Sequence, residues 1–213
     1  AAAAALSLSS AAAAQELASN AGLLEAVNGF VDRLDRVFDY QVAPDFRSND
    51  LYGRRVSLAE YAGRLCIVTF VDQRNEEEAR AWLEEQSIDY LGDPDIVFVN
   101  VLYPGRIPFI VSRDNAADSI RREVDRFLEQ LWQNFSEKER EQFQKTTIRW
   151  IVDWKRDLQR AFNTTRDRVN IVVIDGQGRI RQIVRKKTPK TVEQLRTVVA
   201  GLKQERTAGI ARR

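Results

Sequence analysis

The sequence holds a single cysteine, Cys66, and no histidine. A lone cysteine excludes an intrachain disulfide and a cysteine-rich zinc site. The absence of histidine removes the commonest metal ligand and the commonest general base at neutral pH. Cys66 lies inside the apolar run 65–71, where burial raises the pKa of a thiol and blocks access to it. We therefore interpret Cys66 as a core residue, with a thiol enzyme that uses Cys66 as the alternative.

Six carboxylates could cluster at the carboxyl ends of the two predicted parallel strands, where α/β folds place ligands, and could hold a hard cation such as calcium. They are Asp72, Glu76, Glu77, Glu78, Asp93 and Asp95. Because no calcium-loop spacing accompanies them, we interpret them as solvated residues of a helix start and a loop. The sequence thus predicts no metal site and no cofactor.

A basic stretch near the end of the chain could contact phosphates or an acidic protein. It comprises Arg179, Arg181, Arg185, Lys186, Lys187 and Lys190. No aromatic residues are interleaved for base stacking, and a net charge of +2 creates no strong overall field, so nucleic acid is disfavoured as a partner. We interpret the stretch as a solvated face and retain Arg181, Lys186 and Lys187 as candidate interaction residues.

The composition, with 44% hydrophobic and 30% charged residues in 213, is typical of one soluble domain with a modest extension. Residues 1–14 form an alanine-rich leader that is similar to the end of a signal peptide, although it lacks a positively charged start. A flexible leader is the alternative. We expect an exported protein of the periplasm, cell envelope or an organelle lumen, with the cytoplasm as the alternative. Membrane contact is expected only indirectly or through residues before Ala1.

An amphipathic helix is predicted within 15–41, where apolar residues recur at steps of three and four. Leu24 and Val31 lie on this stripe and are candidate contacts for a partner helix. Packing of the stripe on its own domain is the alternative.

Two continuous apolar runs, 65–71 and 96–102, predict strands that are buried on both faces. Between them, Asn75 is placed to cap a helix whose first turn carries three glutamates, which the helix dipole favours. A strand–helix–strand unit of this kind implies parallel pairing.

The segment 115–163 predicts two long amphipathic helices, the second starting at a capping box formed by Ser136 and Glu139. Three tryptophans lie on their apolar stripes and are candidate anchors for a partner if they face outward: Trp132, Trp150 and Trp154. Their burial in the core is the alternative. A hairpin over 170–185 and a final helix that opens at Thr188 and Pro189 complete the domain, before a tail at 207–213.

Motifs spread over the domain resemble one known family. The run 43–46, then Gly53, 56–58, Tyr61, Gly63 and the strand that ends at Phe70 resemble the opening of the peroxiredoxin and TlpA-type thioredoxin-like proteins. The run 172–175 with Gly178 and Ile180 is similar to the later hairpin of that family. The resemblance implies an α/β fold over 42–206, with a thioredoxin-like central sheet, flanking helices, an N-terminal helix and the long helical insertion 115–163.

The same resemblance implies that the redox site is degenerate. The two cysteines of the family's Cys-x-x-Cys pair correspond to Asn75 and Glu78, and its cis-proline corresponds to Val169. Because a carboxylate has no disulfide chemistry, the resemblance implies a non-catalytic accessory or scaffold subunit that binds other proteins in a larger assembly, which could be associated with a membrane. The alternative is a thiol-dependent oxidoreductase or peroxidase-like enzyme that uses Cys66.

Overall fold

A computed structural model describes residues 41–72, 74–105, 112–165 and 168–211. The chain divides into two units, 1–40 and 41–213, and all described residues belong to the second. The predicted leader and the predicted helix within 15–41, with Leu24 and Val31, therefore lie outside the described residues.

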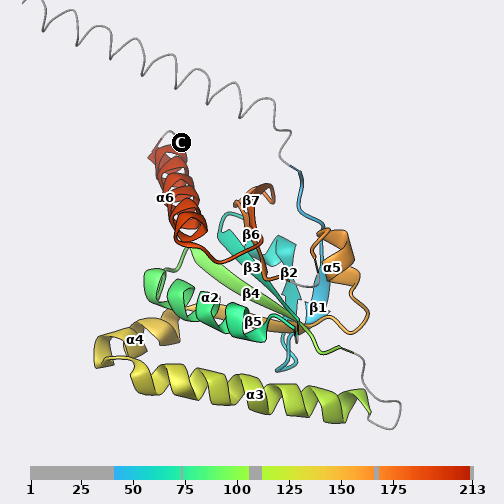
Figure 1. Cartoon of the computed structure of the whole chain (residues 1–213). Coiled ribbons are helices and arrows are strands. Elements are labelled where there is room, and N and C mark those ends of the chain that lie inside the picture. The colour runs from blue at the N-terminus through green and yellow to red at the C-terminus, as the bar shows by residue number, and fades with distance from the viewer. Residues whose placement is uncertain (1–40, 73, 106–111, 166–167, 212–213) are drawn as a thin grey trace, which may run out of the picture. The chain divides into compact units, whose positions relative to one another are not determined.

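The described residues form a five-stranded sheet in the order β5-β4-β3-β6-β7 (Figure 1). Its central strands are the two predicted apolar runs, β3 (Leu65–Asp72) and β4 (Ile96–Tyr103), which pair in parallel. On one side, β5 (Thr147–Val152) adds a further parallel strand. On the other, β6 (Asn170–Ile174) and β7 (Ile180–Val184) form the predicted antiparallel hairpin.

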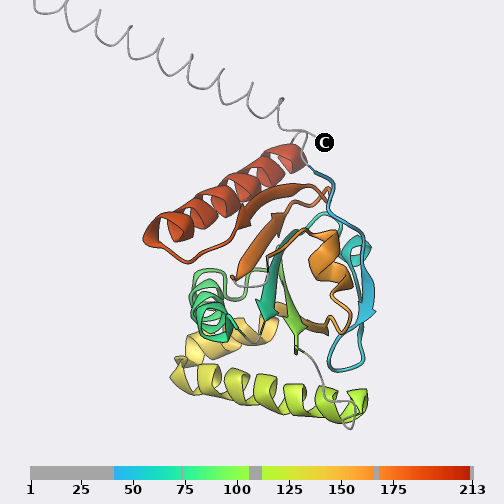
Figure 2. The same ribbon diagram turned by 45° about the vertical axis from the view of Figure 1, so that its right-hand side comes forward.

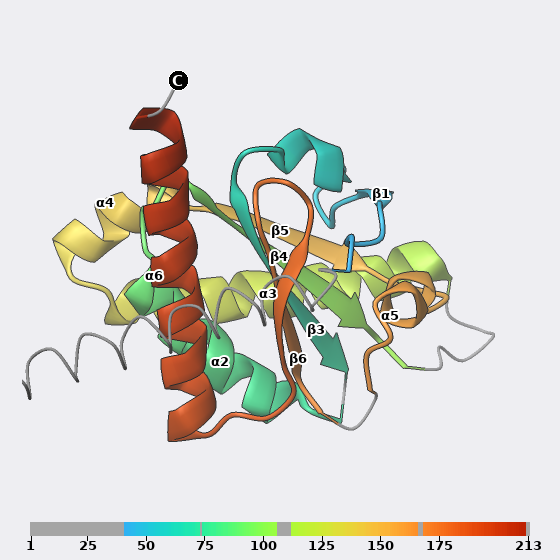
Figure 3. The same ribbon diagram turned by 90° about the horizontal axis from the view of Figure 1, so that it is seen from above.

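Helices α2 (Glu76–Asp89) and α6 (Pro189–Ala211) cover one face of this sheet (Figure 2). The other face carries the hairpin of β1 (Arg47–Asn49) and β2 (Arg55–Ser57), the short 3-10 helix Leu58–Tyr61 and α5 (Asp157–Ala161). Seen from above, the sheet lies between α6 and α5 (Figure 3). Alternate side chains of β3 point to opposite faces of the sheet. Ile67 packs with α2 and α6 on one face, and Val68 packs on the β1–β2 side.

The insertion after β4 departs from the predicted pair of long helices. Helix α3 (Arg113–Asn134) is as expected, and the predicted capping box at Ser136 and Glu139 starts α4. However, α4 (Glu137–Lys145) ends before Thr146, and the next six residues form strand β5 along β4. The prediction of one helix through this region, and of a wholly helical segment 115–163, is therefore wrong.

The physical reason lies at the edge of β4. Pairing with β5 satisfies backbone groups along β4 from Val97 to Leu102, which a helix could not do. The strand also divides its apolar residues between two layers: Trp150 packs with α3, while Ile151 packs with the β1–β2 side. The insertion thus contributes a structural strand as well as α3 and α4.

Candidate functional site

The carboxyl ends of β3 and β4 meet the start of α2, the position at which open α/β sheets place ligands. Asn75 is the residue before α2 and is buried there, but its side chain does not make the predicted cap on the helix. Its side-chain Oδ1 accepts a hydrogen bond of 2.9 Å from the backbone N–H of Asp72. Asn75 therefore closes the turn between β3 and α2 and offers no nucleophile.

Glu78 lies one turn further along α2 and is half-buried. Its Oε1 accepts a hydrogen bond of 2.7 Å from the backbone N–H of Lys187, in the connection between β7 and α6. The carboxylate thus joins α2 to a segment 109 residues away.

Val169 precedes β6 and has no solvent exposure. It packs in the apolar cluster that includes Ala79 and Trp82 of α2. Among the described residues, every peptide bond is trans, Val169 included. Asn75, Glu78 and Val169 therefore lie around the start of α2, each in a structural role.

An ion pair that sequence reasoning missed occupies the same end of the sheet. Asp72 ends β3, and its carboxylate lies 3.4 Å from the guanidinium of Arg156. The Arg156 guanidinium also stacks over the Tyr103 ring, 3.7 Å from its centre. Arg156 adopts a left-handed backbone conformation, with φ of +63°, immediately before α5. No local pattern reveals this contact, because Asp72 and Arg156 are 84 residues apart.

Cys66 lies near the opposite end of β3, at the level of Val97 in β4 and Ile174 in β6. Only 1% of its surface is exposed, and it packs in the core on the β1–β2 side of the sheet. Burial raises the pKa of the Cys66 thiol to about 12. The thiol is therefore protonated at neutral pH, remote from the start of α2.

The three candidate tryptophans differ in their surroundings. Trp150 is buried in β5, 6.4 Å from Phe127 of α3 between ring centres, so an outward-facing anchor at this residue is ruled out. Trp132 is half-buried, with its ring 6.2 Å from that of Phe143 and beneath the guanidinium of Arg140. Trp154 is also half-buried. Of the large apolar side chains in the described regions, the exposed ones are instead Val42 and Tyr52.

The candidate basic residues are largely engaged within the domain. Arg181 forms ion pairs with Asp175 and Glu205. Lys187 pairs with Glu85 at 2.8 Å and donates a hydrogen bond to the carbonyl of Ala81.

Lys186 is the exposed member of the three basic candidates.

The six candidate carboxylates do not form one cluster at the carboxyl ends of the strands. Asp93 and Asp95 precede β4, at the opposite end of the sheet from Asp72, and pair with Lys203 and Arg206 of α6. Within the described ranges, no three residues of the types that ligate metals come together as a cation site.

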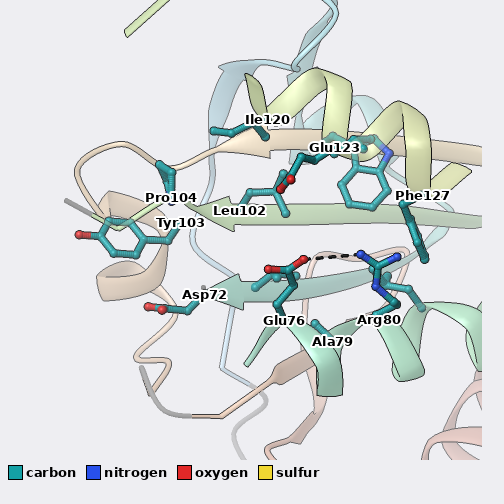
Figure 4. A pocket seen from close by; sticks show the side chains of 14 residues that line it. Asp72, Glu76, Ala79, Arg80, Leu102, Tyr103, Pro104, Ile120, Glu123 and Phe127 are labelled. Atoms are coloured by element: carbon teal, nitrogen blue, oxygen red, sulfur yellow. Dashed lines mark ion pairs between the residues drawn. The ribbon is translucent and has the colours of Figure 1, made fainter. Parts of the chain in front are cut away.

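A pocket of about 240 Å³ opens between α2 and α3, beside the ends of β3 and β4 (Figure 4). Its floor is apolar, with Leu102 and Trp150 from the sheet and Val124 from α3. Charged side chains stand at its rim, among them Glu76 and Arg80 of α2 and Glu123 of α3. One wall of the pocket is formed by α3 and Trp150, which belong to the insertion 115–163. The pocket therefore depends on the insertion.

No family profile matches the chain, and no curated protein matches its sequence. Solved structures do match its fold. One is assigned as a thiol:disulfide interchange protein DsbE of Chlorobium tepidum, with 16% identity over 76% of this chain and 95% of that one, at a TM-score of 0.53. Another is assigned as a protein disulfide isomerase of Bacteroides thetaiotaomicron, with 14% identity over 77% and 89%, at a TM-score of 0.50. The chain has a thioredoxin-like fold, as its motifs predicted.

Proposed function

We propose that this protein is a non-catalytic accessory subunit, derived from the thioredoxin-like superfamily, that binds other proteins in a larger assembly. The observation that carries the proposal is the chemistry at the start of α2. Asn75 and Glu78 stand where the family's cysteines are expected, and both side chains are committed to hydrogen bonds within the domain.

Thiol–disulfide exchange requires an accessible thiolate and, in a Cys-x-x-Cys enzyme, a second thiol to resolve the mixed disulfide. The sequence has one cysteine, and that cysteine is buried with a raised pKa. The two structural neighbours described above are assigned to thiol–disulfide chemistry, which this chain is not equipped to perform. We infer that the fold has been kept for binding.

The inserted helix α3 is the surface to which we assign the partner. Over its 22 residues it buries Val124, Phe127 and Leu131 against the domain, and its remaining side chains are exposed or half-buried. It runs along the outside of the domain, beneath α2 and the sheet (Figure 1). A long helix of this kind can offer a continuous face to a partner without disturbing the core.

Two measurements on the purified chain test the non-catalytic part of the proposal. In an insulin reduction assay with dithiothreitol, we expect no acceleration by this protein, with a Cys-x-x-Cys thioredoxin as the positive control. In a thiol titration, we expect Cys66 to react only after denaturation. Acceleration of insulin reduction, or rapid modification of native Cys66, would instead favour the alternative of a thiol enzyme.

The binding part is tested in the native host with a photo-crosslinking residue placed at Arg122, an exposed position of α3. We expect a discrete cross-linked species from this position. The matched control is the same residue at Gln204, an exposed position of α6. Equal labelling from both positions would argue against the proposed surface. A strictly monomeric protein in size-exclusion light scattering, with no reproducible partner in a pull-down from native extract, would argue against binding altogether.

The proposal places the protein outside the cytoplasm, in the periplasm, cell envelope or an organelle lumen, because the alanine-rich run 1–14 is similar to the end of a signal peptide. In the part of the chain that the structure describes, no helix is long and apolar enough to span a membrane. Fractionation of the native host with compartment markers checks this location, and recovery with cytosolic markers would overturn it.

A further inference from the structure

We propose that the pocket between α2 and α3 binds a small organic cation, namely a primary amine attached to an apolar body about the size of one aromatic ring. This inference does not depend on the accessory-subunit proposal, because it concerns a cavity on the domain itself and a ligand other than a protein.

The size and lining of the pocket indicate the apolar body. A cavity of about 150 Å³ with apolar walls is enough to bind benzene. This pocket has a volume of about 240 Å³, which leaves room for a ring and a short chain. Leu83, Leu102 and Val124 supply aliphatic walls, and Phe127 and Trp150 supply aromatic ones. Small-molecule sites typically combine such walls with a few convergent polar groups.

The charges at the rim indicate the sign of the ligand's head group. Three carboxylates, Asp72, Glu76 and Glu123, line the pocket against one guanidinium, that of Arg80. Asp72 is already paired with Arg156. Glu76 comes from α2 and Glu123 from α3, and Figure 4 shows both carboxylates directed into the space between the helices.

Neither glutamate is firmly neutralised within the domain. The Glu76 carboxylate lies 3.5 Å from Arg80, and the Glu123 carboxylate lies 3.9 Å from Arg126, both in partly exposed pairs. Exposed ion pairs of this kind are weak interactions. A primary ammonium group has three N–H donors and can form charge-assisted hydrogen bonds with carboxylates of this kind.

The same rim disfavours an anionic ligand. Arg80 is the guanidinium of the lining, and it is held over the Phe127 ring, 4.9 Å from its centre, and donates a hydrogen bond of 3.3 Å to Gln130. An incoming carboxylate would have to draw Arg80 from these contacts while facing Glu76 and Glu123. The stacking of Arg80 also shows that an aromatic wall of this pocket accepts a cation on its face.

The experiment compares three probes that share a 2-phenylethyl group and differ in its polar head, by calorimetry and by the chemical shifts of labelled amides: 2-phenylethylamine, 2-phenylethanol and 3-phenylpropanoate. We expect the amine to bind at millimolar concentrations and to shift amides of α2 and α3. The alcohol lacks the positive charge of the amine and should therefore bind about tenfold more weakly, which corresponds to about 1.4 kcal/mol. The carboxylate should not bind.

Variants of the full chain test whether the two glutamates at the rim of the pocket bind the amine. Glu76→Gln and Glu123→Gln should each weaken amine binding by about tenfold, again about 1.4 kcal/mol, and leave alcohol binding unchanged. The matched control is Glu129→Gln, at an exposed position of α3 outside the lining, which should change neither. Ile120→Trp places a large ring at a half-buried lining position and should abolish binding of both probes.

Three results would overturn the proposal. They are the absence of amine binding at millimolar concentrations, equal binding of amine and alcohol, and amine binding that neither Gln variant weakens. The Gln variants alter exposed carboxylates and keep side-chain size, so they decide the question even if Ile120→Trp lowers the stability of the fold.

Discussion

Arg156 and Asp72 form an ion pair of 3.4 Å that joins the start of α5 to the end of β3. Both side chains are withdrawn from solvent, with 14% of Arg156 and 6% of Asp72 exposed. The pair closes the carboxyl end of the sheet beside Asn75 and anchors Arg156 over the Tyr103 ring. The carboxyl end of β3, next to the start of α2, thus holds a buried ion pair.

We expect removal of Arg156 to destabilise the fold strongly, because it leaves the Asp72 carboxylate buried and unpaired. Arg156→Ala should lower the free energy of unfolding by about 3–5 kcal/mol, measured by equilibrium urea unfolding. Arg156→Gly should lose about 1–2 kcal/mol less, since glycine adopts the observed φ of +63° without strain.

A double-mutant cycle with Asp72→Asn isolates the pair. Asparagine keeps an acceptor for the Arg74 backbone N–H, which donates to Asp72 Oδ1 at 3.1 Å. We expect the effects of Asp72→Asn and Arg156→Ala to be strongly non-additive. Additive effects would show that the two side chains contribute independently.

The centre of this fold could be predicted from sequence because its signals are local. The strands at 65–72 and 96–103 consist mainly of apolar residues, and the capping box at Ser136 lies within four residues. The start of α2 at Glu76 was indicated in the same way by Asn75 and the glutamates that follow it. Each of these patterns depends on neighbours in the chain, so no tertiary contact is needed to recognise it.

The insertion and the site's ion pair could not be predicted because they depend on distant partners. Ile151, Trp154 and Leu158 recur at steps of three and four, as on one face of a helix, yet 147–152 becomes a strand because β4 offers an open edge. Likewise, Arg156 meets Asp72 only once β5 has brought the chain back to the end of β3. Parallel pairing after a long crossover leaves no short-range signature.

Cys66 should make the fold sensitive to alkaline pH. Burial raises its pKa to about 12, so the folded state keeps the proton while the unfolded chain loses it above about pH 9. The stabilisation is complete below pH 9, and it falls by about 1.4 kcal/mol per pH unit as the pH rises toward 12.

The measurement is urea unfolding of the wild type and Cys66→Ala at pH 8, 9 and 10. We expect the difference in the free energy of unfolding to shift by about 1 kcal/mol, at the expense of the wild type, between pH 9 and 10, because the unfolded thiol is only half ionised at pH 9. Tyr90, whose pKa burial also raises to about 12, adds an alkaline loss common to both proteins. A constant difference would mean that the thiol ionises in the folded state.

Glu78 should prove structural when compared with its neighbour Glu77. Glu78→Ala removes the acceptor for the Lys187 N–H and should cost about 1–3 kcal/mol in thermal or urea unfolding. Glu77→Ala alters an exposed residue in the same helical turn and should stay within about 0.5 kcal/mol of the wild type. Glu78→Gln keeps an acceptor and should recover most of the loss. Equal effects at 77 and 78 would mean that helix-start charge, and not this hydrogen bond, stabilises α2.

Two glycines should respond to alanine in opposite directions. A Cβ at Gly176 would lie 2.8 Å from the backbone carbon of Gly63, whose N–H donates to the Gly176 carbonyl, so Gly176→Ala must separate two loops and should cost about 1–3 kcal/mol. Gly201 lies inside α6 with open space around its Cβ position, and Gly201→Ala should raise the free energy of unfolding by about 0.5–1 kcal/mol. Urea unfolding of both variants checks the signs. A stabilising Gly176→Ala would contradict the close approach of the two loops, and a destabilising Gly201→Ala would show that this surface of α6 is covered in solution.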